Sequence, residues 1–92
     1  MIVRILNGGQ YRVDAALFDR LNEIDNRIVE AVAKNDEKRM KELLGEMLAV
    51  VKRNGKPIDA REIVPSDVIL PPDDLTMDEA VNIFAGSGLI PD

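Results

Sequence analysis

The spacing of apolar residues changes period at Asp14, and this change restricts the chain to folds that combine a sheet with helices. Before Asp14, two short β-branched and apolar runs (residues 1–6 and 10–13) flank a glycine turn, a pattern typical of a β-hairpin. After Asp14, apolar residues recur every three or four positions, which indicates amphipathic helices. Near Val68 the apolar residues return to the two-residue period of a strand. We therefore predict an α+β fold in a single domain that spans residues 1–92.

The turn of the hairpin is expected at Asn7-Gly8-Gly9, with a glycine in the left-handed region that other residues enter only with strain. This register decides which residues face each other across the two strands. The predicted pairs are Ile5 with Tyr11 and Val3 with Val13 on one face, and Arg4 with Arg12 on the other.

Arg4 and Arg12 are a difficulty in this register, because like charges directly opposite each other destabilise a sheet. An acid is therefore expected between them, either from this chain (Asp67 or Asp14) or from a partner. Asp67 is the best candidate, because a strand at Val68 that joins the hairpin would bring Asp67 beside the arginines. We predict an ion pair with Asp67; without it, the arginines are free for a partner.

Two amphipathic helices are expected after the hairpin. Asp14 caps the first, which spans about twenty residues, and Asp36 caps the second after a left-handed Asn35. So short a connection requires antiparallel helices, and the second helix ends before Gly55. The apolar stripes are Leu17, Leu21, Ile24, Ile28 and Val32 on the first helix, and Met40, Leu43, Leu44, Met47, Leu48 and Val51 on the second. Such stripes can also serve a partner helix, but in a chain this small they mostly face each other and the sheet.

The last third of the chain contains signals for a strand and a short helix. Val68-Ile69-Leu70 lies between prolines, which favours a strand at the edge of a sheet. Thr76 and Glu79 form a capping box for a helix, and Leu89 and Ile90, in a glycine-punctuated tail, are expected to pack back. The predicted architecture is a small antiparallel sheet (the hairpin plus the third strand) packed on an αα-hairpin, with a short C-terminal helix.

The composition argues against several classes of function. A net charge of −5 and an aromatic content of 3% are unfavourable for binding nucleic acid, and the charge also disfavours direct binding to an anionic bilayer. Cysteine and histidine are absent from the sequence, which removes common metal ligands and the commonest general base. We therefore predict no enzyme activity, no metal site and no cofactor. Because no apolar run has the length of a membrane span and no signal peptide is visible, a cytoplasmic location is expected.

Carboxylates are the remaining side chains that could bind a metal ion or act in acid–base catalysis. Those within residues 73–79 lack the alternating spacing and the glycine of a calcium loop, so we interpret them as helix-capping residues. Asp19 and Glu23 have helical spacing but lie off the apolar stripe, whereas an acid–base pair needs burial to separate its two pKa values. A solvated charged face is the better interpretation.

Four stretches of the sequence together resemble those of one known family. They are "MIVRI", "QYRVDAALFDRLNEID", "VPSDVILPPDDLT" and "GLIPD". The chain resembles the phage shock protein A-associated domain family (PspAA) over its whole length. This resemblance implies a non-enzymatic accessory or adaptor protein in an envelope stress response. The partner it implies is PspA, a long-helix protein of the ESCRT-III-like class that assembles on stressed membranes, and through which this chain would be recruited to the membrane.

Two surfaces are candidates for docking such a partner. One is the arginine face of the sheet (Arg4, Arg12 and Asp67), with Tyr11 as a further candidate on the hairpin, and the other is an apolar turn with the tail beside it (Leu70, Leu75, Leu89 and Ile90). Because aromatic anchors are few, we expect an interface near or below ~1,600 Å² whose affinity falls with added salt. The alternative is a self-assembling or small-ligand-binding regulatory module, such as a homo-oligomer, that needs no PspA-type partner.

Overall fold

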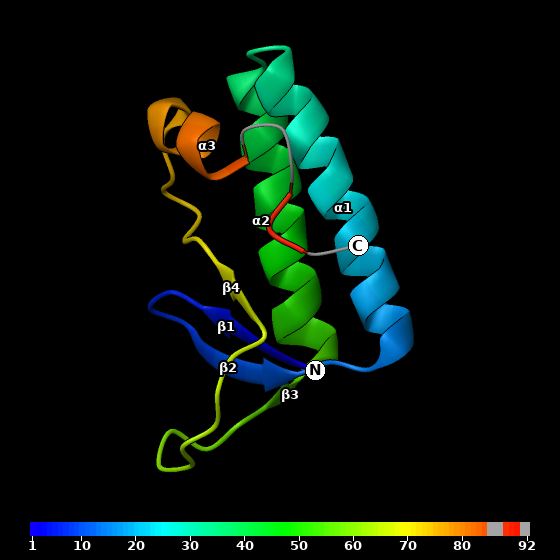
Figure 1. Cartoon of the computed structure of the whole chain (residues 1–92), viewed down its shortest axis with the longest axis vertical. Coiled ribbons are helices and arrows are strands. Elements are labelled where there is room, and N and C mark those ends of the chain that lie inside the picture. Colours follow the sequence, from blue (N-terminus) through cyan, green and yellow to red (C-terminus); the bar gives the residue numbers. More distant parts are fainter. Residues whose placement is uncertain (85–87, 91–92) are drawn as a thin grey trace.

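The computed structural model describes residues 1–84 and 88–90 and confirms an α+β fold (Figure 1). The elements are β1 (Ile2–Ile5), β2 (Gly9–Arg12), α1 (Ala15–Ala33), α2 (Glu37–Asn54), β3 (Lys56–Pro57), β4 (Val68–Leu70) and α3 (Met77–Phe84). The two long helices stand side by side, and the sheet lies beside the lower half of α2. Residues 85–87 and 91–92 of the predicted tail lie outside the described residues.

The sheet is mixed, so the predicted antiparallel sheet is wrong in part. It has four strands in the order β3-β2-β1-β4. β2 pairs antiparallel with β1 and β3, whereas β4 pairs parallel with β1. After α2 the chain forms β3, a two-residue strand that the sequence did not predict and that pairs with β2. The chain then crosses the sheet and pairs with β1 as β4, at the opposite edge. This crossover brings β4 in parallel. The predicted edge position of β4 is confirmed.

The predicted hairpin register is also wrong, by two residues. The observed pairs are Ile2 with Arg12, Val3 with Tyr11, Arg4 with Gln10 and Ile5 with Gly9. The turn therefore lies at residues 6–8, where the Gly8 amide donates to the Ile5 carbonyl over 2.8 Å and Asn7 adopts a φ of 65°. Asparagine tolerates this left-handed conformation. Because Arg4 and Arg12 are not opposite each other, the repulsion that called for an acid between them does not arise.

The helix caps are as predicted. Asp14 accepts a hydrogen bond from the Leu17 amide over 2.8 Å and begins α1. At its C-terminus, Asn35 has a φ of 56°, and the Asp36 amide donates to the Ala31 carbonyl over 2.9 Å, as in a Schellman motif. Asp36 then caps α2. The connection is short because one residue in the left-handed region reverses the chain.

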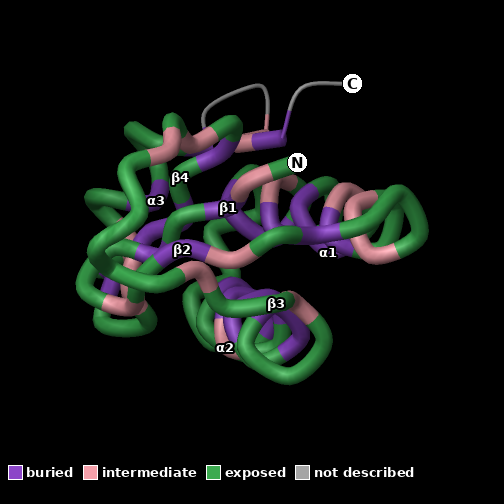
Figure 2. The backbone as a smooth tube through the Cα atoms, turned by 90° about the horizontal axis from the view of Figure 1, so that it is seen from below, coloured by how far each residue is buried: buried purple, intermediate pink, exposed green. Residues whose placement is uncertain are grey.

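The core joins both long helices, α3 and the inner face of the sheet in one cluster. Both predicted helix stripes are buried, apart from the half-buried Leu17. The sheet contributes Val3, Ile5, Val68 and Leu70, and the C-terminal part contributes Leu75, Ala80, Phe84 and Ile90. Figure 2 shows this burial concentrated where the sheet and helices face each other.

The capping box of α3 is confirmed. The Thr76 amide donates to the Glu79 carboxylate over 3.1 Å, and the Glu79 amide donates to the Thr76 hydroxyl over 3.2 Å. The hydrogen bonds from the Thr76 backbone and side chain lower the pKa of the Glu79 carboxyl below its usual value. This helix places Ala80 and Phe84 in the core.

Gly45, within α2, is a position where a larger side chain fits. No described atom beyond the helix's own backbone lies within 4 Å of the place that a Cβ would occupy there. We expect Gly45→Ala to raise the free energy of unfolding by about 1 kcal/mol, because alanine has the higher helix propensity. Urea denaturation measures this change. Gly55→Ala is the contrasting variant and should lower the urea midpoint, because its Cβ would lie 2.7 Å from the Val51 carbonyl oxygen. A lower midpoint for Gly45→Ala contradicts the prediction.

Candidate functional site

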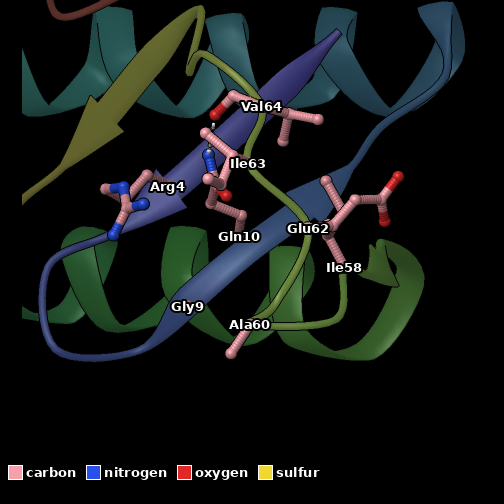
Figure 3. A pocket seen from close by; sticks show the side chains of 8 residues that line it. All are labelled: Arg4, Gly9, Gln10, Ile58, Ala60, Glu62, Ile63 and Val64. Atoms are coloured by element: carbon pink, nitrogen blue, oxygen red, sulfur yellow. Dashed lines mark hydrogen bonds between the residues drawn. The ribbon is translucent and has the colours of Figure 1, made fainter.

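The sheet turns one face to the core, and residues 58–66 lie across part of its outer face (Figure 3). Gln10, on β2, holds this segment in place. Its side-chain amide donates to the Val64 carbonyl over 3.0 Å and to the Ser66 hydroxyl over 2.8 Å. The backbone carbonyl of Gln10 accepts a hydrogen bond from the backbone amide of Ile58 over 2.9 Å. Gln10 is consequently 9% exposed, and the segment that it anchors forms one wall of a groove.

The groove has a volume of about 270 Å³. Its lining consists of Arg4, Gly9, Gln10, Ile58, Ala60, Glu62, Ile63 and Val64. Figure 3 shows Arg4 on β1 at one side of the groove and the crossing segment at the other. Among the described residues, no carboxylate lies within 4 Å of the Arg4 guanidinium. Arg4 therefore presents a charge that the described part of the chain does not pair.

Arg12 differs from Arg4, because its guanidinium lies 3.6 Å from the Glu62 carboxylate. Both side chains of this pair are about half exposed, at 55% and 53%. An exposed ion pair of this kind contributes less than about 1 kcal/mol to stability. The acid beside Arg12 is thus Glu62, which belongs to the crossing segment and was not among the predicted partners.

Asp67 does not make the predicted ion pair; it binds backbone instead. Its carboxylate accepts a hydrogen bond from the Ile2 amide over 2.7 Å, and its amide donates to the Ile2 carbonyl over 2.8 Å. Asp67 therefore fixes the start of β4 against the start of β1. Tyr11 is half-buried and packs against the core, so its ring has a structural contact.

The predicted apolar docking residues were expected to be exposed, and this expectation is wrong for most of them. Leu70, Leu75 and Ile90 are 0%, 3% and 5% exposed because they belong to the core, and Leu89 is half-buried against it. The confirmed part of the prediction is that Leu89 and Ile90 pack back. Among the described residues, the exposed large apolar side chains are Met1, Leu6, Ile63, Ile69, Val81 and Ile83.

Asp25 is an important residue that the sequence analysis missed. It is fully buried on α1, and its two carboxylate oxygens accept hydrogen bonds from the amides of Leu89 and Ile90, each over 3.0 Å. A Cβ added at Gly88 would overlap this carboxylate. The available signal was the position of Asp25, four residues after Leu21 and within the apolar stripe. An acid there requires a partner, and the C-terminal residues provide it.

The described residues contain no group of three or more acidic, histidine or cysteine side chains that could hold a metal ion. None of the helices in the described ranges has the length and hydropathy that crossing a bilayer requires. The described surface has a groove that is lined by Arg4 and by the exposed side chain of Ile63.

Comparison with known proteins gives one match. A family model described as "PspA-Associated protein" (PspAA) matches residues 1–92, the whole sequence. No curated protein and no solved structure matches the chain.

Proposed function

The chain belongs to the PspA-associated protein family, and from this we propose that it is a non-enzymatic accessory protein that binds a PspA-type protein in an envelope stress response. The family match over residues 1–92 is the observation that carries the proposal. The partner is then a long-helix protein of the ESCRT-III-like class that assembles on stressed membranes. This chain would act in the cytoplasm and reach the membrane through that partner.

The character of the surface supports a protein partner. The chain carries a net charge of −5, which opposes direct binding to anionic lipid. Exposed aliphatic side chains beside a cation are instead features of a contact surface between proteins.

We expect the purified chain to bind the PspA-type protein of the same genome in a calorimetric titration. Binding should weaken at high salt, because an interface with few aromatic anchors depends more on charge complementarity. Circular dichroism establishes that both proteins are folded. Absence of binding at both low and high salt rejects the proposed function.

Self-assembly is the second function, and the same exposed aliphatic side chains support it. Analytical ultracentrifugation of the chain alone separates the two. A dimer or larger assembly at micromolar concentration, together with no heat in the titration, favours the self-assembling module.

A further inference from the structure

We propose that the partner docks on the outer face of the sheet around Arg4, and that it offers a carboxylate flanked by aliphatic side chains. The surface consists of Arg4, Leu6, Ile63 and Ile69, and is called the Arg4 surface below. This inference rests on the proposed function for the identity of the partner. It adds where the partner binds and which chemistry it presents.

The apolar part of the Arg4 surface is gathered around one cation. Leu6, Ile63 and Ile69 are 46%, 99% and 51% exposed. Ile69 is the register partner of Arg4 on the neighbouring strand, and Ile63 lines the same groove as Arg4. Leu6 follows Arg4 by two residues, and its amide extends the pairing of β1 with β4 by donating to the Leu70 carbonyl, which places Leu6 on the same face as Arg4. A single exposed aliphatic side chain needs no explanation, but three beside one arginine form a surface that gains from being covered.

The positive charge of Arg4, at the centre of this surface, indicates which charge the partner presents. The sequence has 17 acidic and 12 basic residues, and Arg12 on the same sheet already lies beside Glu62. Arg4 is 4 Å or more from every described carboxylate. A guanidinium binds a carboxylate through two parallel hydrogen bonds, so an acidic side chain of the partner is the complement that Arg4 lacks.

Glu62 limits how the partner can lie. It lines the same groove as Arg4 and already lies beside Arg12, so a second acid on the partner would find no unpaired cation there and would lie near a carboxylate. The partner segment therefore carries its carboxylate at the Arg4 side and none at the Glu62 side. This arrangement fixes one orientation along the groove.

The backbone beneath the Arg4 surface is held in place before binding. Arg4 stands on β1, which is paired on both sides by β2 and β4. Ile63 stands next to Val64, whose carbonyl accepts the Gln10 hydrogen bond. Because hydrogen bonds hold the backbone on both sides of the groove, the backbone loses little conformational entropy on docking, and the ordering cost falls on the exposed side chains.

Two substitutions test the inference against two matched controls. We expect Arg4→Gln to weaken binding of the PspA-type protein about tenfold to a hundredfold, the usual effect of losing a charged hydrogen bond, and Ile63→Ser to weaken it about tenfold. Arg20→Gln and Val81→Ser, at an exposed arginine on α1 and at a 44% exposed valine on α3, should change affinity less than about twofold. All four side chains are exposed, so unfolding midpoints should stay unchanged.

The outcomes separate the surface from the function. No binding by the unmodified chain rejects the proposed function. Normal binding by the unmodified chain, with Arg4→Gln and Ile63→Ser binding equally well, overturns the Arg4 surface and leaves the function standing. Equal losses for Arg4→Gln and Arg20→Gln also overturn it. If the two substitutions instead break up assemblies of the chain alone, the occupant is a second copy and the inference is wrong.

Discussion

Asp25→Ala is expected to lower the free energy of unfolding by about 2–3 kcal/mol. The substitution leaves the amides of Leu89 and Ile90 without their acceptor, in a place where Ile90 is 5% exposed. Each buried amide that loses its partner costs about 1–3 kcal/mol. If the C-terminal residues detach instead, the fold loses the burial of Ile90, which is worth a similar amount. The better helix propensity of alanine offsets only about 0.5 kcal/mol.

Urea denaturation measures the loss, and amide hydrogen exchange at Leu89 and Ile90 shows where it arises. Asp19→Ala is the matched control, because it makes the same change on the same helix at an exposed position. It should not destabilise the protein. An unchanged midpoint for Asp25→Ala, with exchange at Ile90 as slow as before, would show that the buried carboxylate contributes nothing to holding these residues.

The features that the sequence predicted well are those whose signals lie close together in the chain. Asp14 bonds to an amide three residues later, and Thr76 and Glu79 are also three residues apart. The turn between the long helices depends on Asn35 alone adopting a positive φ. Such signals are local, so the helices and their caps follow from the order of residues.

The hairpin register was wrong because the apolar pattern fits both registers. A shift of two residues keeps Val3 and Ile5 on the inner face, and only a shift of one would turn them outward. The choice falls to the turn, where Gly9 has the positive φ (84°) predicted for a glycine, but Asn7 also has one (65°) and lies at the centre of the turn. Either residue type tolerates that conformation, and the pattern alone could not decide.

The candidate site was predicted only in part because it is assembled by the crossover. Arg4 was singled out from the sequence, but the groove beside it exists because residues 58–66 pass over the sheet and are held by Gln10. That path depends on β3 pairing with β2 and on the parallel entry of β4. Neither pairing has a local sequence signal, since β3 contains two residues, one of them proline.

Gly88→Ala is expected to destabilise the protein by about 2 kcal/mol, an overpacking cost. All three atoms nearest to a Cβ at Gly88 belong to the Asp25 carboxylate, so the new methyl group meets that side chain. The C-terminal residues or the aspartate must therefore shift, which weakens the two hydrogen bonds from Leu89 and Ile90.

A double-mutant cycle distinguishes this cause from a general intolerance at Gly88. In the Asp25→Ala background the three nearest atoms are gone, so Gly88→Ala should cost close to nothing or stabilise slightly by restricting the unfolded chain. The coupling free energy between the two positions is then about 2 kcal/mol, far above the ~0.3–0.5 kcal/mol scatter of independent sites. Urea denaturation of the four proteins gives the value. An equal loss from Gly88→Ala in both backgrounds would mean that the close approach to Asp25 is not what requires glycine here.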